Sequence, residues 1–473
     1  MKIEFPPKII QGGMGVGVSG WLLAQSVAML GQLGVVSGTT LDVMLARRLQ
    51  LGDPGGHMER AMADFPDQEM ASRIWDRFFI AGGKKADQPF QTLPLHSLDS
   101  PRPLVELTVL GNFVEVTLAK SGHSGLIGIN FLEKIQLPTL PSLYGAMLAG
   151  VDYVLMGAGI PRSIPGIIDG FTTGQAAKLR IDVEGAAPGE EFYTRFDPTE
   201  FWGGTPPTLA RPNFVPIISS YTLALTMAKK ASGSVAGFVV EGPLAGGHNA
   251  PPRGGINLGP TGEPIYGERD VPDLAKIREL GLPFWLAGSQ ATPEKLREAL
   301  AVGAAGVQVG TAFAFSNESG IAPSLKKRIL KEVRAGRATV FTDPVASPTG
   351  FPFKIIPLPG SVMEPALYQA RGRVCDLGYL RHAYRRDDGG VTFRCPAEPP
   401  AQYTRKGGEV EETPGRVCLC NGLLATAGLA QTRNGEPELP LLTAGDDLVH
   451  LTRFLRDDEN GYSSGDVIRH LLG

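Results

Sequence analysis

His248 is the side chain of this 473-residue chain that is best suited to acid–base chemistry. It follows the small residues Ala245-Gly246-Gly247, which come after the apolar run 236–240 and Glu241. A buried strand that breaks into a turn of small residues places a reactive group at the carboxyl end of a parallel sheet. An imidazole there titrates close to neutral pH. We therefore predict that His248 is catalytic. The alternative is a tight turn followed by a solvated loop histidine.

Two later turns combine a glycine with a hydroxyl side chain. Gly288-Ser289 ends the apolar run 283–288, and Gly310-Thr311 ends the run 306–311. Backbone N–H groups at such turns bind phosphate, and the last two strands of a (β/α)8 barrel commonly supply them. The pair of turns therefore predicts a phosphate site, whereas each glycine alone would indicate only a turn.

The elements that must position these residues are strand patterns that alternate with helical patterns. Eight units of this kind in an even rhythm predict an α/β fold, a TIM (β/α)8 barrel. A doubly wound α/β sheet is the alternative. The eight strand patterns begin near Lys8, Val35, Leu126, Tyr153, Phe214, Gly237, Pro283 and Gly306.

A glycine-rich turn, Gln11-Gly12-Gly13-Met14-Gly15, follows the first strand pattern. Glycines there let the backbone approach a flat or phosphorylated ligand closely. Residues 15–20 also fit a GxGxxG pattern, but a dinucleotide fold needs an acidic residue about twenty positions later. Residues 34–39, GVVSGT, occupy that position and contain no acidic residue. The GxGxxG pattern is therefore only weak evidence for a dinucleotide site.

Two segments interrupt or follow the predicted barrel, which comprises residues 1–41 and 125–335. Residues 42–124 form a predicted insertion, a cap or lid, with helices at 42–51 and 67–80 and strands at 104–109 and 113–119. Residues 336–473 form a predicted carboxyl-terminal subdomain.

Composition excludes several classes of partner. With 42% hydrophobic residues, 20% charged residues and a net charge of −3, the chain lacks the basic field that nucleic acid requires. The basic run 326–328 lies in a helical pattern and is expected to form a solvated helix face. We find no apolar run of transmembrane length and no signal peptide, so we expect a cytoplasmic protein with no membrane partner.

Five stretches resemble the FMN-dependent nitronate monooxygenase (2-nitropropane dioxygenase) superfamily, which also contains FMN-dependent enoyl reductases. They are QGGM at 11–14, IGINF at 127–131, AGGH at 245–248, LAGS at 286–289 and GVQVGTAFAFSNES at 306–319. The carboxyl-terminal third resembles the trans-acting enoyl reductases of polyunsaturated fatty acid and polyketide synthases. The stretches that carry this second resemblance are 342–353, CDLGYLR from Cys375, RCPAEP from Arg394 and CLCNGL from Cys418.

The resemblance implies an FMN site. Its phosphate would be held by Gly246, Gly247, Gly288, Ser289, Gly310 and Thr311. The isoalloxazine ring would lie near Gly13, Met14 and Asn130, with His248 beside its reactive N5 edge. Many relatives carry an acidic residue directly before the Ala of AGGH, where this chain has Leu244.

The same resemblance implies an oxidoreductase that oxidises alkyl nitronates with O2. The alternative is an NAD(P)H- and FMN-dependent reductase of enoyl thioesters that acts in trans with a fatty acid or polyketide synthase, where an acyl carrier protein would be the partner. A second alternative is a non-catalytic FMN-binding accessory component. The substrate is thus a small molecule or an acyl thioester. A homo-oligomer is compatible with each alternative.

All four cysteines lie in the last quarter of the chain, at Cys375, Cys395, Cys418 and Cys420. Their spacing does not match a familiar zinc or iron–sulfur pattern, although four thiols in so short a segment could close one S4 site. We favour free thiols and assign no metal ligand.

Overall fold

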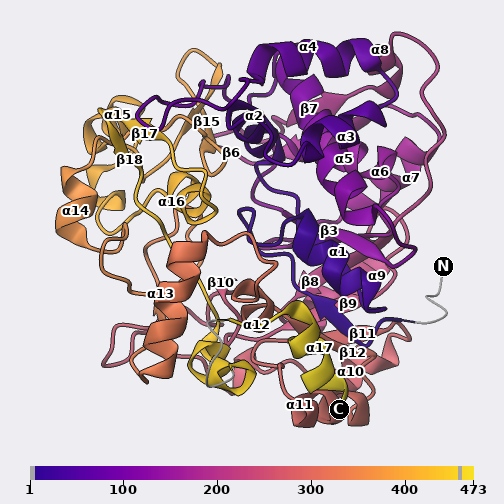
Figure 1. Cartoon of the computed structure of the whole chain (residues 1–473), viewed down its shortest axis with the longest axis vertical. Coiled ribbons are helices and arrows are strands. Elements are labelled where there is room, and N and C mark those ends of the chain that lie inside the picture. Colours follow the sequence, from indigo (N-terminus) through magenta and orange to yellow (C-terminus); the bar gives the residue numbers. More distant parts are fainter. Residues whose placement is uncertain (1–5, 456–460) are drawn as a thin grey trace.

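The computed structural model describes residues 6–455 and 461–473. At its centre, parallel strands form an eight-stranded sheet in the order β1-β12-β11-β9-β8-β4-β3-β2. The two edges of this sheet meet, because Ile10 pairs with Leu33 and the Gln11 N–H donates to the Leu33 carbonyl at 2.9 Å. The sheet is therefore a TIM barrel, as predicted from the strand patterns (Figure 1). Its strands are β1 (Ile9–Gln11), β2 (Gly34–Ser37), β3 (Ile127–Leu132), β4 (Tyr153–Gly157), β8 (Asn213–Ile218), β9 (Phe238–Glu241), β11 (Phe284–Ala287) and β12 (Gly306–Val309).

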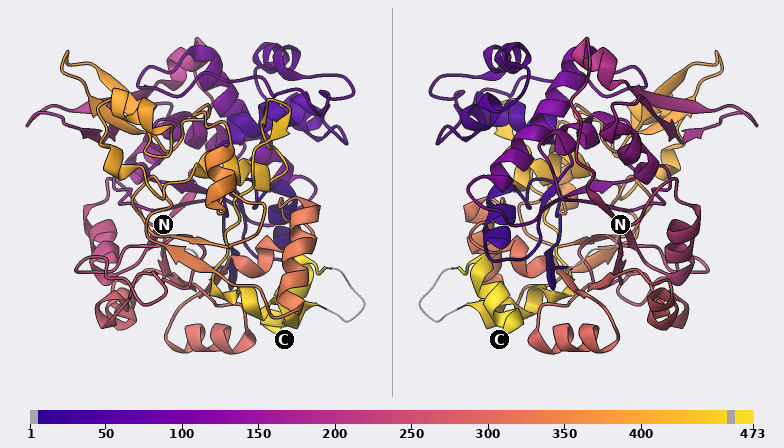
Figure 2. Two further views of the ribbon diagram at one scale, coloured as in Figure 1. Left: turned by 90° about the vertical axis from the view of Figure 1, so that its left-hand side faces the viewer. Right: turned by 90° about the vertical axis from the view of Figure 1, so that its right-hand side faces the viewer.

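A ring of helices surrounds the barrel. Each of the first seven barrel strands leads to a helix of this ring, namely α1 (Trp21–Met29), α5 (Arg102–Lys120), α6 (Thr139–Leu148), α7 (Ile164–Thr172), α9 (Tyr221–Lys230), α10 (Leu274–Glu279) and α11 (Pro293–Ala301). The eighth position of the ring is occupied by α17 (Ser464–Leu472), which packs against both α1 and α11 (Figure 2).

The predicted strands at 104–109 and 113–119 are wrong, because both segments lie in the single helix α5. This helix is buried on nearly every side, against α1, α2 (Leu41–Gln50), α3 (His57–Ala63) and α6. A helix enclosed in this way is apolar all round and loses the 3.6-residue periodicity, so its sequence looks like buried strands. The helices approach closely at Gly111, where a Cβ would lie 2.6 Å from the Leu41 carbonyl oxygen.

The other predicted helices of this segment, at 42–51 and 67–80, are confirmed as α2 and α4 (Gln68–Phe78). The division of the chain into a barrel, an insertion at 42–124 and a subdomain at 336–473 stays a prediction. Two helices from these added segments, α5 and α17, belong to the barrel's own helix ring.

Small sheets and helices cover the end of the barrel where the strands finish. The hairpin β5 (Ala177–Ile181) and β7 (Phe192–Phe196), with α8 (Pro198–Trp202), follows α7. Two three-stranded sheets are β10 (Gly247–His248) with β14 (Phe353–Ile355) and β13 (Phe341–Asp343), and β16 (Val391–Arg394) with β15 (His382–Arg385) and β6 (Val183–Glu184). The remaining elements are α12 (Thr311–Ala314), α13 (Pro323–Arg334), α14 (Pro365–Ala370), α15 (Pro400–Arg405), α16 (Leu419–Thr426), β17 (Thr432–Arg433), β18 (Glu436–Pro437) and the 3-10 turns at Glu268–Asp270, Val410–Glu412 and Asp446–Phe454.

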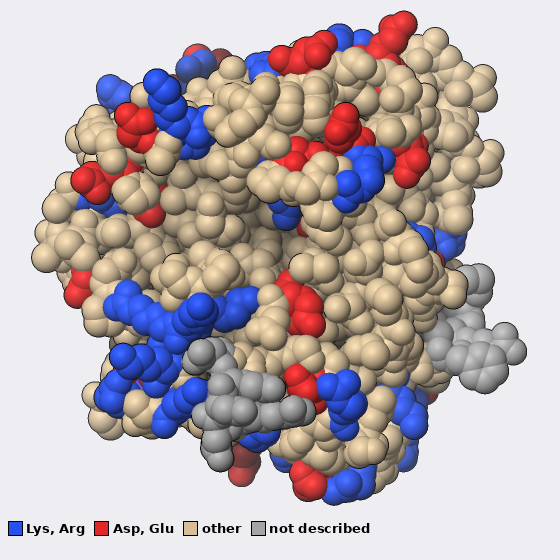
Figure 3. All heavy atoms as spheres, in the orientation of Figure 1, with Lys and Arg blue, Asp and Glu red and all other residues tan. Residues whose placement is uncertain are grey.

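The basic run on α13 is only partly a solvated face. Lysine and arginine side chains gather over this helix on the molecular surface (Figure 3), and Lys327 and Arg328 are exposed. Lys326, by contrast, is buried, and its Nζ donates to the carbonyl oxygens of Ser316 at 2.6 Å and Ser319 at 3.1 Å. Burial lowers the pKa of Lys326 to about 8. The expectation of a fully solvated run is therefore wrong for Lys326, which anchors the segment after α12.

Among the helices of residues 6–455 and 461–473, none is long and apolar enough to cross a membrane.

Candidate active site

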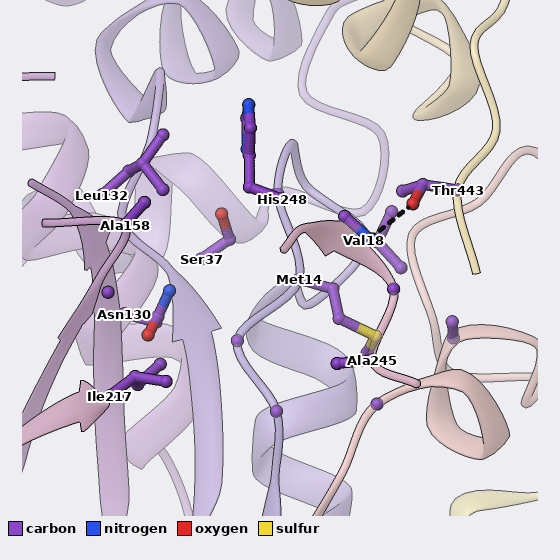
Figure 4. Close-up of a pocket in the computed structure, with 18 of the residues that line it drawn as sticks. Met14, Val18, Ser37, Asn130, Leu132, Ala158, Ile217, Ala245, His248 and Thr443 are labelled. Atoms are coloured by element: carbon purple, nitrogen blue, oxygen red, sulfur yellow. Dashed lines mark hydrogen bonds between the residues drawn. The ribbon is translucent and has the colours of Figure 1, made fainter. Parts of the chain in front are cut away.

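A cavity of about 260 Å³ lies at the carboxyl ends of the barrel strands. Every one of the eight strands contributes its end or its following loop to the lining. Asn130 and Ile217 lie on one side of this cavity, Met14 and Ala245 on the other, and His248 stands at its rim (Figure 4). All ten residues predicted from the sequence line this one cavity: Gly13, Met14, Asn130, Gly246, Gly247, His248, Gly288, Ser289, Gly310 and Thr311.

The first turn is braced by buried polar side chains. The Gln11 Nε2 and the Met14 N–H donate to the Ser19 Oγ at 2.8 and 2.9 Å, and the Ser19 hydroxyl donates to the Gly12 carbonyl at 2.8 Å. A Cβ on Gly13 would lie 2.3 Å from the Cβ of Asn130, so glycine is required there by the close approach of β3. The turn and Asn130 therefore form one rigid floor of the cavity.

His248 is held by the carboxyl-terminal third of the chain. Its strand β10 pairs antiparallel with β14, and the His248 ring packs edge-on against Phe353, with 4.7 Å between the ring centroids. The Nε2 of His248 lies 2.7 Å from the Oγ of Ser347, which is fully buried. Burial lowers the pKa of His248 to about 4, so the imidazole is neutral at physiological pH.

Glu241 is a cavity residue that the sequence reasoning left out of the site. It is the last residue of β9 and lines the cavity together with His248. Burial raises the pKa of its carboxyl to about 7. An acidic residue at the end of a buried barrel strand is the signal that could have identified it.

The two turns predicted to bind phosphate lie next to each other, because β11 and β12 are neighbours in the barrel. Gly288 and Ser289 have φ angles of 95° and 51°. A non-glycine residue with positive φ costs about 1–3 kcal/mol, and such residues cluster at ligand sites. A Cβ on Gly310 would meet only Met14, at 3.6 Å from its sulfur, so this glycine faces open space.

The two glycines of the AGGH turn lie against the carboxyl-terminal segment. A Cβ on Gly246 would lie 2.7 Å from the backbone of Ala444 and Gly445. The Gly247 N–H donates to the Thr443 Oγ1 at 2.8 Å, the hydrogen bond drawn in Figure 4. Whether these two glycines also contact a phosphate stays a prediction.

Three buried polar atoms of the lining have no protein partner among the described residues. They are the Asn130 Oδ1, the Ser289 Oγ and the Gln308 Oε1. A buried polar atom without a partner costs about 1–3 kcal/mol, so this arrangement favours a bound polar ligand.

The carboxyl-terminal third supplies a wall of the same cavity. Its lining residues are Phe353, Tyr379, Leu380, Leu419, Cys420, Leu423, Thr443, Ala444 and Asp447. Asp42 holds the Tyr379 side chain in place, because the Tyr379 hydroxyl donates to the Asp42 Oδ1. The other carboxylate oxygen of Asp42 lies 2.8 Å from the Nε2 of His96. Burial and the Asp42 carboxylate raise the pKa of Tyr379 well above its usual value.

A second cavity, of about 480 Å³, shares Tyr379 and Leu380 with the first. Polar and charged side chains line it, including Lys134, Arg180 and Glu190. The two cavities therefore adjoin at Tyr379 and Leu380.

The four cysteines line one small cavity of about 20 Å³, and Cys420 also lines the first cavity, at the ends of the barrel strands. Burial and the neighbouring Cys418 raise the pKa of Cys375 to about 12, and the same causes raise the pKa of Cys420. Within the described part of the chain, no three His, Cys, Asp or Glu side chains are arranged to hold a metal ion. That these thiols are free stays a prediction.

Comparison with known proteins identifies one family segment. Residues 212–348 match the family described as nitronate monooxygenase. This segment contains Glu241, His248 and both turns at Gly288 and Gly310. No curated protein sequence matches the chain.

Several solved structures align with almost the whole chain. FabK from Thermotoga maritima is 16% identical, with a TM-score of 0.47 and coverage of 99% of this chain and 93% of that one. A nitroalkane oxidase from Streptomyces ansochromogenes is 17% identical, with a TM-score of 0.45 and coverage of 99% and 95%. The enoyl reductase domain of MlnA, from the macrolactin biosynthesis cluster of Bacillus amyloliquefaciens, is 10% identical, with a TM-score of 0.47 and coverage of 98% and 93%.

Proposed function

We propose, from the match of residues 212–348 to the family described as nitronate monooxygenase, that this oxidoreductase binds FMN and reduces enoyl thioesters with NAD(P)H. The observation that carries the choice of substrate is the second cavity. A nitronate has few atoms and would leave this 480 Å³ space empty. An acyl thioester has a long polar arm for which a polar cavity beside the reaction site provides room.

The residues of the first cavity, at the carboxyl ends of the barrel strands, fit FMN. The unpartnered Asn130 Oδ1, Ser289 Oγ and Gln308 Oε1 can each bind a polar group of the flavin. The neighbouring turns at Ser289 and Gly310 have the backbone geometry and the open space that a phosphate needs. The site has one such pair of turns, which suits the single phosphate of FMN. When bound, the flavin would supply the hydride chemistry.

The protein side chains would orient the substrate and manage its protons. His248 is neutral, and Ser347 holds its ring in one orientation beside the cavity. Such an imidazole can donate one hydrogen bond to the substrate carbonyl without adding a charge. Phe353 and Leu380 would exclude water from the reacting atoms.

Nitronate oxidation with O2 is the second candidate function. The family segment supports it directly, and a neutral His248 could also act as a base towards a nitroalkane. A non-catalytic FMN-binding component would bind the flavin and turn over neither substrate. In the reductase proposal an acyl carrier protein would present the substrate.

The test is to identify the flavin and to compare substrates. Mass spectrometry of the released cofactor should show FMN, and FAD as the main species would contradict the cofactor assignment. The flavoprotein should reduce crotonyl-pantetheine with NADPH or NADH much faster than it reduces crotonate, because crotonate lacks the thioester arm. Oxygen consumption with propyl-2-nitronate, without turnover of crotonyl-pantetheine, would favour the second candidate.

A further inference from the structure

The β5–β7 hairpin carries three basic side chains on one exposed face. Its strands pair antiparallel, with Lys178 directly opposite Arg195. Because side chains alternate between the two faces of a strand, Arg180 lies on the same face as Lys178. The other face of the hairpin is buried against α6 and α7, whereas these three side chains are exposed. We call Lys178, Arg180 and Arg195 the basic face.

Two of these cations have no counter-charge. No described residue forms an ion pair or a side-chain hydrogen bond with Lys178 or Arg195. Arg180 has a contact of 3.4 Å to the exposed Glu191. Like charges directly opposite each other in an antiparallel pair destabilise the sheet. The pair of Lys178 and Arg195 therefore costs stability in the free protein, and a negatively charged partner would offset that cost.

The acidic side chains at the tip of the hairpin are already paired. Glu184 and Glu190 each lie 2.7 Å from an arginine of the β15–β16 hairpin. Asp182 lies 3.9 Å from Lys134. Residues 177–196 are all described, and their only charged side chains without a partner are those of Lys178 and Arg195. The basic face therefore attracts anions, although the whole chain has a net charge of −3.

The basic face borders the second cavity. Arg180, Ile181 and Asp182 of the hairpin line this cavity together with His382 and Phe393 of the β15–β16 hairpin. The tip strand β6 pairs with β15, and both hairpins project from the same corner of the molecule (Figure 2). Residue 178 precedes residue 180 by about 7 Å along the strand. A molecule attached to an arm in the second cavity would therefore lie against the basic face.

From this arrangement we propose that the basic face docks an acyl carrier protein through an acidic surface of that protein, while its thioester arm occupies the second cavity. The inference rests on the proposed reduction of enoyl thioesters. A carrier protein is bonded covalently to its arm, so it must lie where the arm enters. An acidic surface there would meet the two cations that lack a partner. Such charges at an interface mainly raise the association rate, and salt weakens them.

The double variant with Lys178→Glu and Arg195→Glu tests the docking surface. With a crotonyl-loaded, acidic acyl carrier protein as substrate, its kcat/KM should fall about tenfold or more at low salt, because attraction becomes repulsion. The kcat/KM for crotonyl-pantetheine, which has the arm without the carrier protein, should stay within about twofold of wild type. High salt should shrink the difference between wild type and variant. A variant that turns over both substrates like wild type would overturn the inference.

The double variant with Lys327→Glu and Lys331→Glu is the matched control. Both lysines are exposed on α13, where basic side chains also gather, and neither lines the second cavity (Figure 3). This control reverses the same number of charges and should leave the turnover of the carrier-bound substrate unchanged. An equal loss in the control would show that net charge, rather than the basic face, attracts the carrier protein, and would overturn the inference.

Crotonyl coenzyme A distinguishes a protein surface from a phosphate site. Its phosphate groups are also anionic, but it carries no carrier protein. The hairpin variant should lose less kcat/KM with crotonyl coenzyme A than with the crotonyl-loaded carrier protein. An equal loss would show that the basic face binds phosphate groups and would overturn the docking of a carrier protein.

Stability distinguishes docking from a structural role. Arg195→Glu alone places opposite charges across the strand pair, so its Tm should rise by about 1 °C while kcat/KM with the carrier protein falls. A Tm that falls together with turnover would make Arg195 a structural residue and overturn the inference. Failure of the docking surface leaves the turnover of crotonyl-pantetheine intact. If crotonyl-pantetheine does not reoxidise the reduced flavin, the proposed function itself is contradicted, and this inference falls with it.

Discussion

The first cavity, at the carboxyl ends of the barrel strands, has two walls of different origin. The barrel wall consists of turns at strand ends, and its polar atoms include the unpartnered Asn130 Oδ1, Ser289 Oγ and Gln308 Oε1. The carboxyl-terminal wall consists of side chains such as Phe353 from strand β14 and Tyr379 and Thr443 from loops. The barrel wall offers groups that fit a cofactor, and the carboxyl-terminal wall positions His248 and borders the second cavity. Cofactor affinity and substrate turnover should therefore be separable by mutation.

The largest effect on activity is expected from a substitution in the barrel wall. Gly310→Val should abolish FMN binding and hence all turnover, because the added side chain would fill the space proposed for phosphate. The fold should tolerate the change, since the φ of Gly310 is −104° and a Cβ there meets only Met14 at 3.6 Å. Flavin absorbance and Tm measure the two effects. Gly242→Ala, whose Cβ meets nothing within 4 Å, is the control. Full flavin occupancy in Gly310→Val would remove Gly310 from the phosphate site.

His248→Ala should separate FMN affinity from substrate turnover. We expect FMN to stay bound and turnover to fall by roughly 10²- to 10⁴-fold, the range for loss of an acid–base group. Single-turnover rates at full flavin occupancy provide the measurement. Activity within about threefold of wild type would show that His248 takes no part in the chemistry.

Ser347→Ala tests whether the carboxyl-terminal wall orients the imidazole. The variant removes the hydrogen bond to His248 and the two that Ser347 Oγ forms with Thr349. Loss of the bond to His248, about 1 kcal/mol, should lower kcat by several-fold and leave FMN affinity unchanged. Ser316→Ala is the control, because Ser316 is equally buried and its hydroxyl donates to the Phe313 carbonyl at 2.9 Å. Equal kcat values for the two variants would mean that Ser347 does not position His248.

Tyr379→Phe should have the smallest effect on turnover and a measurable effect on stability. It removes a hydrogen bond to the buried Asp42 carboxylate, which is worth about 1.5–3 kcal/mol. Tyr403→Phe is matched, because its hydroxyl donates to Glu412 at 2.6 Å away from the cavity. Tyr379→Phe should lose more free energy of unfolding in urea than Tyr403→Phe, because Asp42 is buried and Glu412 is exposed. Only Tyr379→Phe should also raise the KM for the thioester. An unchanged KM would separate Tyr379 from the substrate path.

The contrast between the barrel wall and the carboxyl-terminal wall also explains which residues of the site the sequence could predict. Each barrel strand is a short apolar run between turns, so all eight were recognisable, and residues at strand ends such as Asn130 and Gly310 could be assigned to one cavity. Ser347 and Tyr379 could not, because loops bring them back over long sequence separations. Helix α5 was mistaken for strands because burial on every side removed its periodicity. Glu241 lay within the motif that was noted, but its place in the cavity lining is visible only in three dimensions.

The most direct test of the account is anaerobic stopped-flow spectroscopy of the flavoprotein, first with NADPH or NADH and then with crotonyl-pantetheine. We expect NAD(P)H to bleach the FMN absorbance rapidly and the enoyl thioester to restore it without O2. Flavin that stays oxidised with both nucleotides would contradict the reductase function. So would reduced flavin that only O2 reoxidises.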